Sequence, residues 1–468
     1  MIRKTNNKKL IIYELNEVPR KLIEYYLKYK PNCNIKKIIN QGFFIDTFTL
    51  DEGELHPWST WPTVHRGVPN KFHNIKFINQ DLKKSQTYKP IWEFLIEKKI
   101  SVGIFGSLQS YPPIKNNNVK FFLPDTFAPN ELAFPKKLMD FQKFNLDLVK
   151  NNKAISTSIT KKQIVNFLTL FFNNTISKKS FIISTLQILK ELLKPIYKKR
   201  RSMVQPVISF DLYLKYLKNT KPEFSTFFTN HVAGMMHRYW KYLFPNDNES
   251  RNSIHSKFHS KSILKAMDIA DFQLGELSKF TKANNYDLWI ISSMGQDYVD
   301  RGNYIPELLI KDFNSLLKVL NLNKDKYSLL PAMQPDICLS SNDLPSFNIL
   351  RDRFKNITDS NGNLVFKERY KPVGLRLNLS IIRSSEISQK KVVFVKKRKF
   401  NIKDLGLEII RRDVGTGYHI PKGVFIGDGN LTEKVYKKNI QNIDTCKIAP
   451  TILNHFNLSI PNYMQKNI

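Results

Sequence analysis

KLIIYELNEVPRKLIEYYLKY, residues Lys9–Tyr29, joins two hydrophobic patterns of different period. Its first seven residues form a short, mostly apolar run, which is typical of a buried strand. After Pro19 the apolar side chains recur at helical spacing, which predicts a helix directly after the strand. The stretch therefore predicts a strand–helix unit, the element from which parallel sheets are built.

The same alternation recurs along the chain and predicts an α/β fold. We expect a three-layer α/β/α sandwich, in which helices cover both faces of a mostly parallel central sheet. In such sheets the functional site lies at the carboxyl ends of the strands. Further strands are predicted at Ile100–Ser107, Glu223–His231, Tyr286–Ser293 and Lys422–Gly429, and helices at Pro90–Lys99, Ser262–Lys282 and Asp444–Leu458.

Two segments interrupt this pattern within a single predicted domain, residues 1–468. Residues 150–205 predict an inserted basic helical arm, in which Glu191 is the one acidic residue. A basic amphipathic helix can lie on an anionic membrane, but a helical cap packed on the core with a solvated basic face explains the pattern as well. Residues 348–403 are basic and β-like, and predict a small flanking sheet.

Composition narrows the class of partner. The net charge of +34, from 74 basic and 40 acidic residues, suggests an anionic partner: nucleic acid, an anionic membrane surface or a phosphorylated substrate. A codon bias towards Lys and Asn is an equally good explanation. Nucleic acid ranks last, because the sequence holds no helix-turn-helix, RNA-recognition or zinc-finger signature.

The three cysteines are scattered and have no metal-site spacing, which fits a reducing compartment. No apolar run is long enough for a signal peptide or a membrane span. We therefore expect a cytoplasmic protein that can lie at the periphery of a membrane.

Side chains that bind metals or phosphates cluster where predicted strands end. Histidine and carboxylate ligands beside a hydroxyl nucleophile are what metal-assisted phosphoryl or sulfuryl transfer needs. Taken singly, a strand-end histidine is more often a structural hydrogen-bonding group, and Thr63 is equally suited to cap a helix. The candidates are Glu14, Thr60, Thr63, His65, His73, Asn230, His231, His237 and His419.

The order of these residues resembles the alkaline phosphatase superfamily, in particular its type I phosphodiesterase/nucleotide pyrophosphatase branch. The family places an acid after the first strand, and Glu14 stands there in place of Asp. Its nucleophile lies in a Thr-x-Pro context, which Thr60 matches in TWPT. The stretch from there to Gly67 is shorter than usual, so Thr63 stays a rival nucleophile. We expect Glu14 to lie beside the nucleophile hydroxyl.

The resemblance also implies metal ligands. His237 matches the histidine of the family's Asp-x-x-x-His motif, but the acid is missing, so Asn230 or His231 must substitute. His419 matches a Gly-x-His-x-x-x-Gly context, and the tail DTCKIAPTILNHFNLSIPNYM resembles the family's closing helix.

A second pair of ligands is replaced altogether. Where the family has Ser-Asp-His-Gly, this chain has SSMG, and neither Ser293 nor Met294 can replace a carboxylate and an imidazole around a hard divalent ion. The resemblance therefore implies one ion rather than two, and neutral imidazoles suit zinc.

The implied activity is that of a metal-dependent phosphoesterase, a phosphodiesterase-like hydrolase, or a phosphotransferase. Its substrate would be a phosphorylated small molecule or a glycan- or lipid-linked phosphate, and a sulfatase-like reaction ranks lower. Arg66, His73 and Arg238 are the expected phosphate contacts. The alternative is a catalytically degenerate member that binds an anionic glycan or phospholipid.

Overall fold

The computed structural model describes residues 8–78, 80, 82, 87–151, 161–173, 176–245, 254–301, 305–330, 332, 333, 336–372, 374–410 and 415–465. The chain divides into two compact units. The first comprises Met1–Phe77, Lys84–Asp300 and Gly415–Ile468, and the second comprises Ile78–Lys83 and Arg301–Val414.

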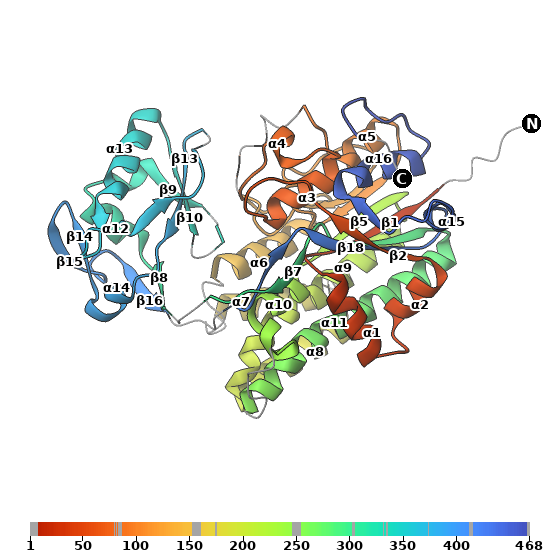
Figure 1. Ribbon diagram of the computed structural model, residues 1–468, viewed down its shortest axis with the longest axis horizontal. Coiled ribbons are helices and arrows are strands. Elements are labelled where there is room, and N and C mark those ends of the chain that lie inside the picture. The colour runs from red at the N-terminus through yellow and green to blue at the C-terminus, as the bar shows by residue number, and fades with distance from the viewer. Residues whose placement is uncertain are drawn as a thin grey trace, which may run out of the picture. The chain divides into compact units, whose positions relative to one another are not determined.

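An eight-stranded sheet forms the centre of the first unit, in the order β19-β2-β18-β6-β1-β5-β3-β4 (Figure 1). All neighbouring strands pair in parallel except β18, which runs antiparallel to β2 and β6. The mostly parallel sheet predicted from the sequence is thus confirmed. The strands are β1 (Leu10–Leu15), β2 (Phe43–Phe48), β3 (Val102–Phe105), β4 (Val119–Leu123), β5 (Phe224–Thr229), β6 (Asp287–Ile291), β18 (Lys422–Gly427) and β19 (Asn442–Asp444).

Helices cover both faces of this sheet and complete the predicted three layers (Figure 1). Successive side chains of β1 point to opposite faces, so Ile11 and Tyr13 join one apolar core while Leu10 and Ile12 join the other. The first core includes side chains of α1 (Arg20–Tyr29), α2 (Asn34–Gln41), α6 (Leu138–Asn151), α9 (Gln205–Thr220), α10 (His231–Leu243) and α11 (Ile254–Asn284). The second includes side chains of α3 (Pro57–Arg66), α5 (Ile91–Glu97), α15 (Leu431–Lys437) and α16 (Ile448–His455).

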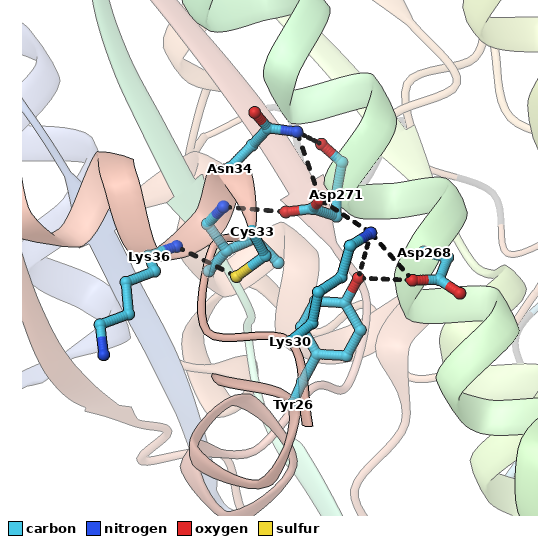
Figure 2. A network of polar contacts seen from close by, with 8 residues as sticks. Tyr26, Lys30, Cys33, Asn34, Lys36, Asp268 and Asp271 are labelled. Carbon is cyan, nitrogen blue, oxygen red and sulfur yellow. Dashed lines mark hydrogen bonds and ion pairs between the residues drawn. The ribbon is translucent and has the colours of Figure 1, made fainter. Parts of the chain in front are cut away.

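A polar network fastens the first two helices to α11 (Figure 2). The Lys30 ammonium pairs with Asp268 at 3.1 Å and with Asp271 at 3.5 Å. Asp271 also accepts hydrogen bonds at the start of α2, where the Asn34 amide reaches it at 3.2 Å. The Cys33 thiol caps α2 by accepting the N–H of Lys36 at 3.4 Å. This cysteine therefore has a structural role.

Residues 150–205 lie in the first unit and are helical where they are described. They contain α7 (Lys161–Phe172), α8 (Lys178–Leu193) and the 3₁₀ helix η2 (Pro195–Met203). Residues 152–160 and 174–175 of the predicted arm lie outside the described residues. No described helix of the protein has the length and apolar character needed to cross a membrane.

The second unit has an apolar core of its own and small, antiparallel sheets. The predicted β-rich segment 348–403 lies within the longer stretch of this unit, Arg301–Val414. Its strands are β8 (Glu307–Ile310), β9 (Tyr327–Leu330), β10 (Asp336–Ser341), β11 (Ile357–Thr358), β12 (Phe366–Glu368), β13 (Arg376–Ile381), β14 (Val392–Val395), β15 (Arg398–Asn401) and β16 (Leu407–Ile410). Its helices are α12 (Phe313–Val319), α13 (Leu344–Lys355) and α14 (Ser385–Lys390).

Candidate metal centre

Three possible metal ligands converge just beyond the carboxyl end of β1. The ligand atoms of Glu17, His237 and His419 all lie within 4.8 Å of one another. Oε2 of Glu17 is 2.9 Å from Nε2 of His237 and 3.4 Å from Nε2 of His419. The two histidines come from distant parts of the chain, and the structure brings their ring centroids to 5.1 Å, as the sequence motifs predict. Glu17 is the member that sequence reasoning missed.

Both oxygens of the Glu17 carboxylate are held by amide groups. Asn16 donates its side-chain N–H to Oε1 at 2.8 Å, and Gln296 donates to Oε2. Glu17 itself has a φ of 60°, a left-handed conformation that is costly for a residue with a Cβ and is found mostly where the surroundings enforce it. This conformation turns the carboxylate towards the histidines at the sheet edge.

A short strand pair positions His419. Strand β17 (Gly417–Ile420) runs antiparallel to β7 (Gly295–Tyr298), and the register places His419 directly opposite Gln296. Since opposite residues of a strand pair point to the same face, the amide that holds Glu17 and the imidazole beside it share one surface. The ladder thereby fixes two of the groups around the carboxylate at once.

Thr416 anchors the helix that carries His237. Its backbone N–H donates to the His237 carbonyl at 2.7 Å, and its hydroxyl accepts the N–H of Lys241 at 3.1 Å. In an unbroken helix those two helical groups would bond to each other, so Thr416 is inserted into the hydrogen-bond ladder of α10. The non-helical Tyr239 (φ −125°, ψ 15°) marks the resulting kink. The insertion ties α10 to β17 next to the candidate ligands.

The hydrogen bonding of His237 leaves its other nitrogen for a cation. Its Nδ1 is 3.0 Å from the Gly417 carbonyl, which can only accept, so Nδ1 carries a proton. In the neutral ring Nε2 then presents a lone pair to the Glu17 carboxylate, and a proton or a metal ion must lie between them. Ligating histidines commonly donate their second nitrogen to a carbonyl in this way.

The donor set fits a zinc ion. Two imidazoles and one carboxylate, with a position left for water or substrate, form a known ligand set of catalytic zinc. Bonds of about 2.0–2.2 Å in a tetrahedral arrangement separate ligand atoms by roughly 3.3–3.6 Å, close to the separations of Glu17 from the two histidines. The His237 side chain is 33% exposed, whereas the side chains of Glu17 and His419 are 2% and 7% exposed, so the candidate centre opens to solvent on the His237 side.

Electrostatic interactions favour the charged forms of Glu17 and His419. Burial alone would raise the pKa of Glu17, but His419 and His237 outweigh it and hold the pKa well below its usual value. Burial alone would lower the pKa of His419, but the Glu17 carboxylate raises it above its usual value. The cluster thus stabilises positive charge next to Glu17.

Aromatic and acidic side chains border the centre on the α3 side. The His56 and His419 rings meet edge to face, with centroids 5.6 Å apart, and Tyr418 stacks on His419 at 4.6 Å. The Tyr418 hydroxyl donates a hydrogen bond to Glu54. These contacts position the His419 ring.

The structure buries both candidate nucleophiles. Thr60 and Ser293 are fully buried, and their hydroxyl oxygens are 2.8 Å apart. Ser293, which the sequence resemblance aligns with a metal-binding carboxylate, therefore contacts the threonine directly. Met294 next to it is also fully buried. Thr60, Ser293 and Met294, which the resemblance places near a second ion, are thus all buried.

Thr63 lies beyond the first turn of α3, in a buried hydrogen-bonded chain. It donates to Asp51 at 2.7 Å and lies 3.0 Å from Nε2 of His73. Because Nδ1 of His73 accepts the N–H of Ile75, its Nε2 carries the proton and donates to Thr63. Burial lowers the pKa of His73 to about 3, so the ring stays neutral. His73 therefore does not act as a base towards Thr63 in this arrangement.

Glu14 pairs with a histidine rather than with a threonine. It points to the α3 side of the sheet, where its Oε1 is 2.8 Å from Nε2 of His65. Its other oxygen has no hydrogen-bond partner among the described residues. Strand β1 continues to Leu15, so Glu14 lies inside the strand and only the residues that follow reach the sheet edge.

The remaining predicted site residues lie in other surroundings. His231 uses both ring nitrogens, with the Thr229 hydroxyl at 2.7 Å and the Ala266 carbonyl at 2.9 Å, so it does not join the metal ligands. Asn230 accepts a hydrogen bond from Asn16 at 2.7 Å, and the same Asn16 amide donates to Glu17.

The two predicted arginine contacts also differ from each other. The Arg66 guanidinium donates to the Tyr88 carbonyl, and burial lowers its pKa to about 10. It is thus engaged at the far end of α3. Arg238 follows His237 in α10, and its carbonyl accepts a 3.5 Å hydrogen bond from Thr416.

Comparison with solved structures finds similar chains over almost the full length. Murine ectonucleotide pyrophosphatase/phosphodiesterase 5 is 12% identical at a TM-score of 0.41, with 98% of each chain covered. Phosphonoacetate hydrolase from Sinorhizobium meliloti is 10% identical at a TM-score of 0.36, with 90% of each chain covered. A scan of protein-family models gives no match, and a search of curated proteins gives none. The strand order of the sheet itself establishes the fold class.

Proposed function

We propose that the chain is a metal-dependent phosphoesterase that works with one divalent ion, zinc, held by Glu17, His237 and His419. The convergence of these three ligand atoms within 4.8 Å of one another carries the proposal. An ion bound there would neutralise a phosphoryl oxygen and lower the pKa of a water at its open position. The proposed nucleophile is water, because the hydroxyls of both candidate threonines are buried and hydrogen-bonded.

The chain's own residues provide binding and orientation. Asn16 and Gln296 hold the Glu17 carboxylate, and the Gly417 carbonyl sets the tautomer of His237. The substrate class we propose is a phosphodiester or phosphomonoester of a small molecule, which approaches over His237, the exposed member of the group. Arg238, the next residue of α10, is the proposed phosphate contact, since a guanidinium can clamp two phosphate oxygens.

The alternative is a protein that binds a phosphorylated ligand without turning it over. The pairing of Glu14 with His65 and of Thr60 with Ser293 favours it, because these groups bond to each other and the threonine hydroxyl is not free to act as a nucleophile. The two functions share the metal centre and differ only in turnover.

Two neighbouring glutamates allow a matched test. Zinc binding to metal-free protein is measured by titration calorimetry for the wild type, Glu17→Gln and Glu14→Gln. Loss of a ligand carboxylate should weaken zinc binding by at least a hundredfold in Glu17→Gln. Glu14→Gln keeps a group that can hydrogen-bond to His65 and should stay within about threefold of the wild type. Equal affinities in all three proteins would refute the metal centre.

Turnover is assayed on the same proteins with chromogenic phosphodiester, phosphomonoester and sulfate ester substrates. We expect phosphoester hydrolysis that appears with zinc, disappears on chelation and is lost in Glu17→Gln and in His237→Ala. Zinc binding without turnover of any ester would refute the phosphoesterase and favour the alternative, a protein that only binds a phosphorylated ligand. Hydrolysis that is unchanged by chelation would refute the metal-dependent mechanism.

A further inference from the structure

Helix α8 turns polar side chains inward. Ser180, Ser184 and Glu191 are buried, and their spacing places them on one face of the helix. The Ser184 hydroxyl donates to the Ser180 carbonyl at 2.8 Å. A surface helix of a globular protein normally turns its apolar face inward, so α8 has the opposite polarity.

The inward polar groups are satisfied by one another. Gln187 donates to Glu191 at 3.0 Å and to the Tyr197 carbonyl at 2.9 Å. Glu191, the one acid of the arm, forms an ion pair with Arg201 and has a side chain only 3% exposed. Because these buried polar groups are hydrogen-bonded, α8 can pack on the protein with its polar side chains facing inward.

The outer face of α8 is apolar, and α7 also carries exposed apolar residues. Leu192 and Leu193 are 76% and 81% exposed, and Phe172 at the end of α7 is 74% exposed. Single exposed apolar residues are ordinary, but a group of this size on neighbouring helices marks an interaction site. The other exposed members are Ile164, Val165, Leu168, Ile182, Ile183, Leu186 and Leu189.

The two helices pack as a pair. Phe181 of α8 stacks on Phe171 and Phe167 of α7, with centroids 4.0 and 5.3 Å apart. The aromatic contacts use the inner sides of the helices and leave the exposed residues outside. At 12 and 16 residues, α7 and α8 are shorter than the roughly 20 residues that a membrane-spanning helix needs.

The positive charge on and beside α7 and α8 indicates which kind of partner surface these helices can bind. Lys161, Lys178, Lys190 and Lys194 are exposed on or next to α7 and α8, while Glu191 is turned inward. Lysines beside an apolar face are what an anionic lipid surface binds. A second copy of the chain is a poorer partner for this face. It would place the same lysines, and a net charge of +34, against the lysines of the first copy, and like charges repel.

We propose that α7 and α8 dock the protein on an anionic membrane, with their apolar outer faces among the acyl chains and their lysines among the headgroups. Membrane docking is independent of the metal centre, because it needs none of its residues. It would confine the protein to a lipid surface and to phosphate groups found there.

The test is sedimentation of the full chain with vesicles of phosphatidylcholine alone or with one-third phosphatidylglycerol. Wild-type protein should bind the anionic vesicles, and high salt should weaken binding. Ile182→Gln/Leu186→Gln/Leu189→Gln should reduce binding at least tenfold. Its matched control, Leu344→Gln/Ile349→Gln on α13, changes apolar residues of similar exposure in the second unit and should bind normally. These substitutions are on exposed positions, and circular dichroism checks that the variants fold.

Charge is tested separately. Each lysine near an anionic surface contributes about 1 kcal/mol, or roughly a fivefold change in affinity. Lys161→Gln/Lys190→Gln/Lys194→Gln should therefore weaken binding on the order of a hundredfold, and Lys98→Gln/Lys282→Gln/Lys318→Gln should change it little.

Two results would overturn the proposal. One is vesicle binding that is absent in the wild type or the same in all variants. The other is a dimer in light scattering that the glutamine variants of α8 convert to a monomer, without vesicle binding, which would make a second copy the occupant of this face.

Discussion

Replacing Thr60 by Val separates a structural threonine from a catalytic one. The substitution keeps the size of the side chain and removes the hydroxyl that lies 2.8 Å from Ser293. Because both residues are fully buried, the Ser293 hydroxyl is left without this partner. An unsatisfied buried hydroxyl costs about 1–3 kcal/mol, so we expect the free energy of unfolding to fall by that amount. Zinc-dependent turnover should stay within about threefold, because the proposed nucleophile is water.

The assay combines urea unfolding with turnover. All five tryptophans lie in the first unit, so their fluorescence reports the unit that contains the substitution. In the double variant Thr60→Val/Ser293→Ala both hydroxyls are gone, and much of the lost stability should return. A folded Thr60→Val protein that binds zinc normally but loses turnover a thousandfold would refute the reasoning and make Thr60 the nucleophile.

Four further outcomes follow from described contacts. Gln296→Leu removes a hydrogen bond to the Glu17 carboxylate and should weaken zinc binding 10- to 100-fold in calorimetry, with little change in fold. Thr416→Val removes the acceptor of the Lys241 N–H and should lower the unfolding free energy by about 1–3 kcal/mol, measured in urea. Zinc at a hundred times its dissociation constant should raise the unfolding free energy of the wild type by about 2.7 kcal/mol, and Glu17→Gln should abolish that gain. The pKa of His73 is about 3 in the folded protein and near 6.5 in the unfolded protein, so between these values the unfolded state binds one more proton. The free energy of unfolding should therefore fall as pH falls from 6.5 towards 3. In urea titrations at several pH values, His73→Gln should reduce the slope of unfolding free energy against pH by up to about 1.4 kcal/mol per pH unit.

The fold and two of the three candidate metal ligands were readable from the sequence. Alternating strand and helix patterns predicted the parallel sheet, and the contexts of His237 and His419 predicted that they would meet. The first prediction rests on hydrophobic period, which the sequence carries directly. The second rests on the resemblance of the motifs around the two histidines to those of a known family, together with the strand-end positions of these motifs.

Glu17 escaped sequence reasoning for physical reasons. The pattern placed the acid at Glu14, but β1 extends to Leu15, and strand alternation turns Glu14 to the α3 side. The carboxylate that reaches the histidines follows the strand and depends on a left-handed φ, which a single sequence does not reveal for a glutamate. The available signal was a second acid three residues after the first, in ELNE.

His231 was misleading for the opposite reason. Its place at the start of α10 suggested a ligand, but a side chain at that position turns to α11, where the Ala266 carbonyl accepts its proton. The direction of a side chain depends on the helix packed against it, and that contact spans segments far apart in the sequence.

The strand pair β7–β17 has a consequence for how the chain can change in evolution. The second unit leaves the first after Asp300 and returns at Gly415, and the backbone N–H of Val299 donates to the Thr416 carbonyl at 3.0 Å. Because the ends are pinned together, doubling the length of the inserted chain adds only about 0.6 kcal/mol of loop-closure entropy. The inserted unit can therefore change in length at little cost in loop-closure entropy. A one-residue slip between β7 and β17 is not tolerated in the same way, since it would turn His419 to the opposite face and dismantle the centre.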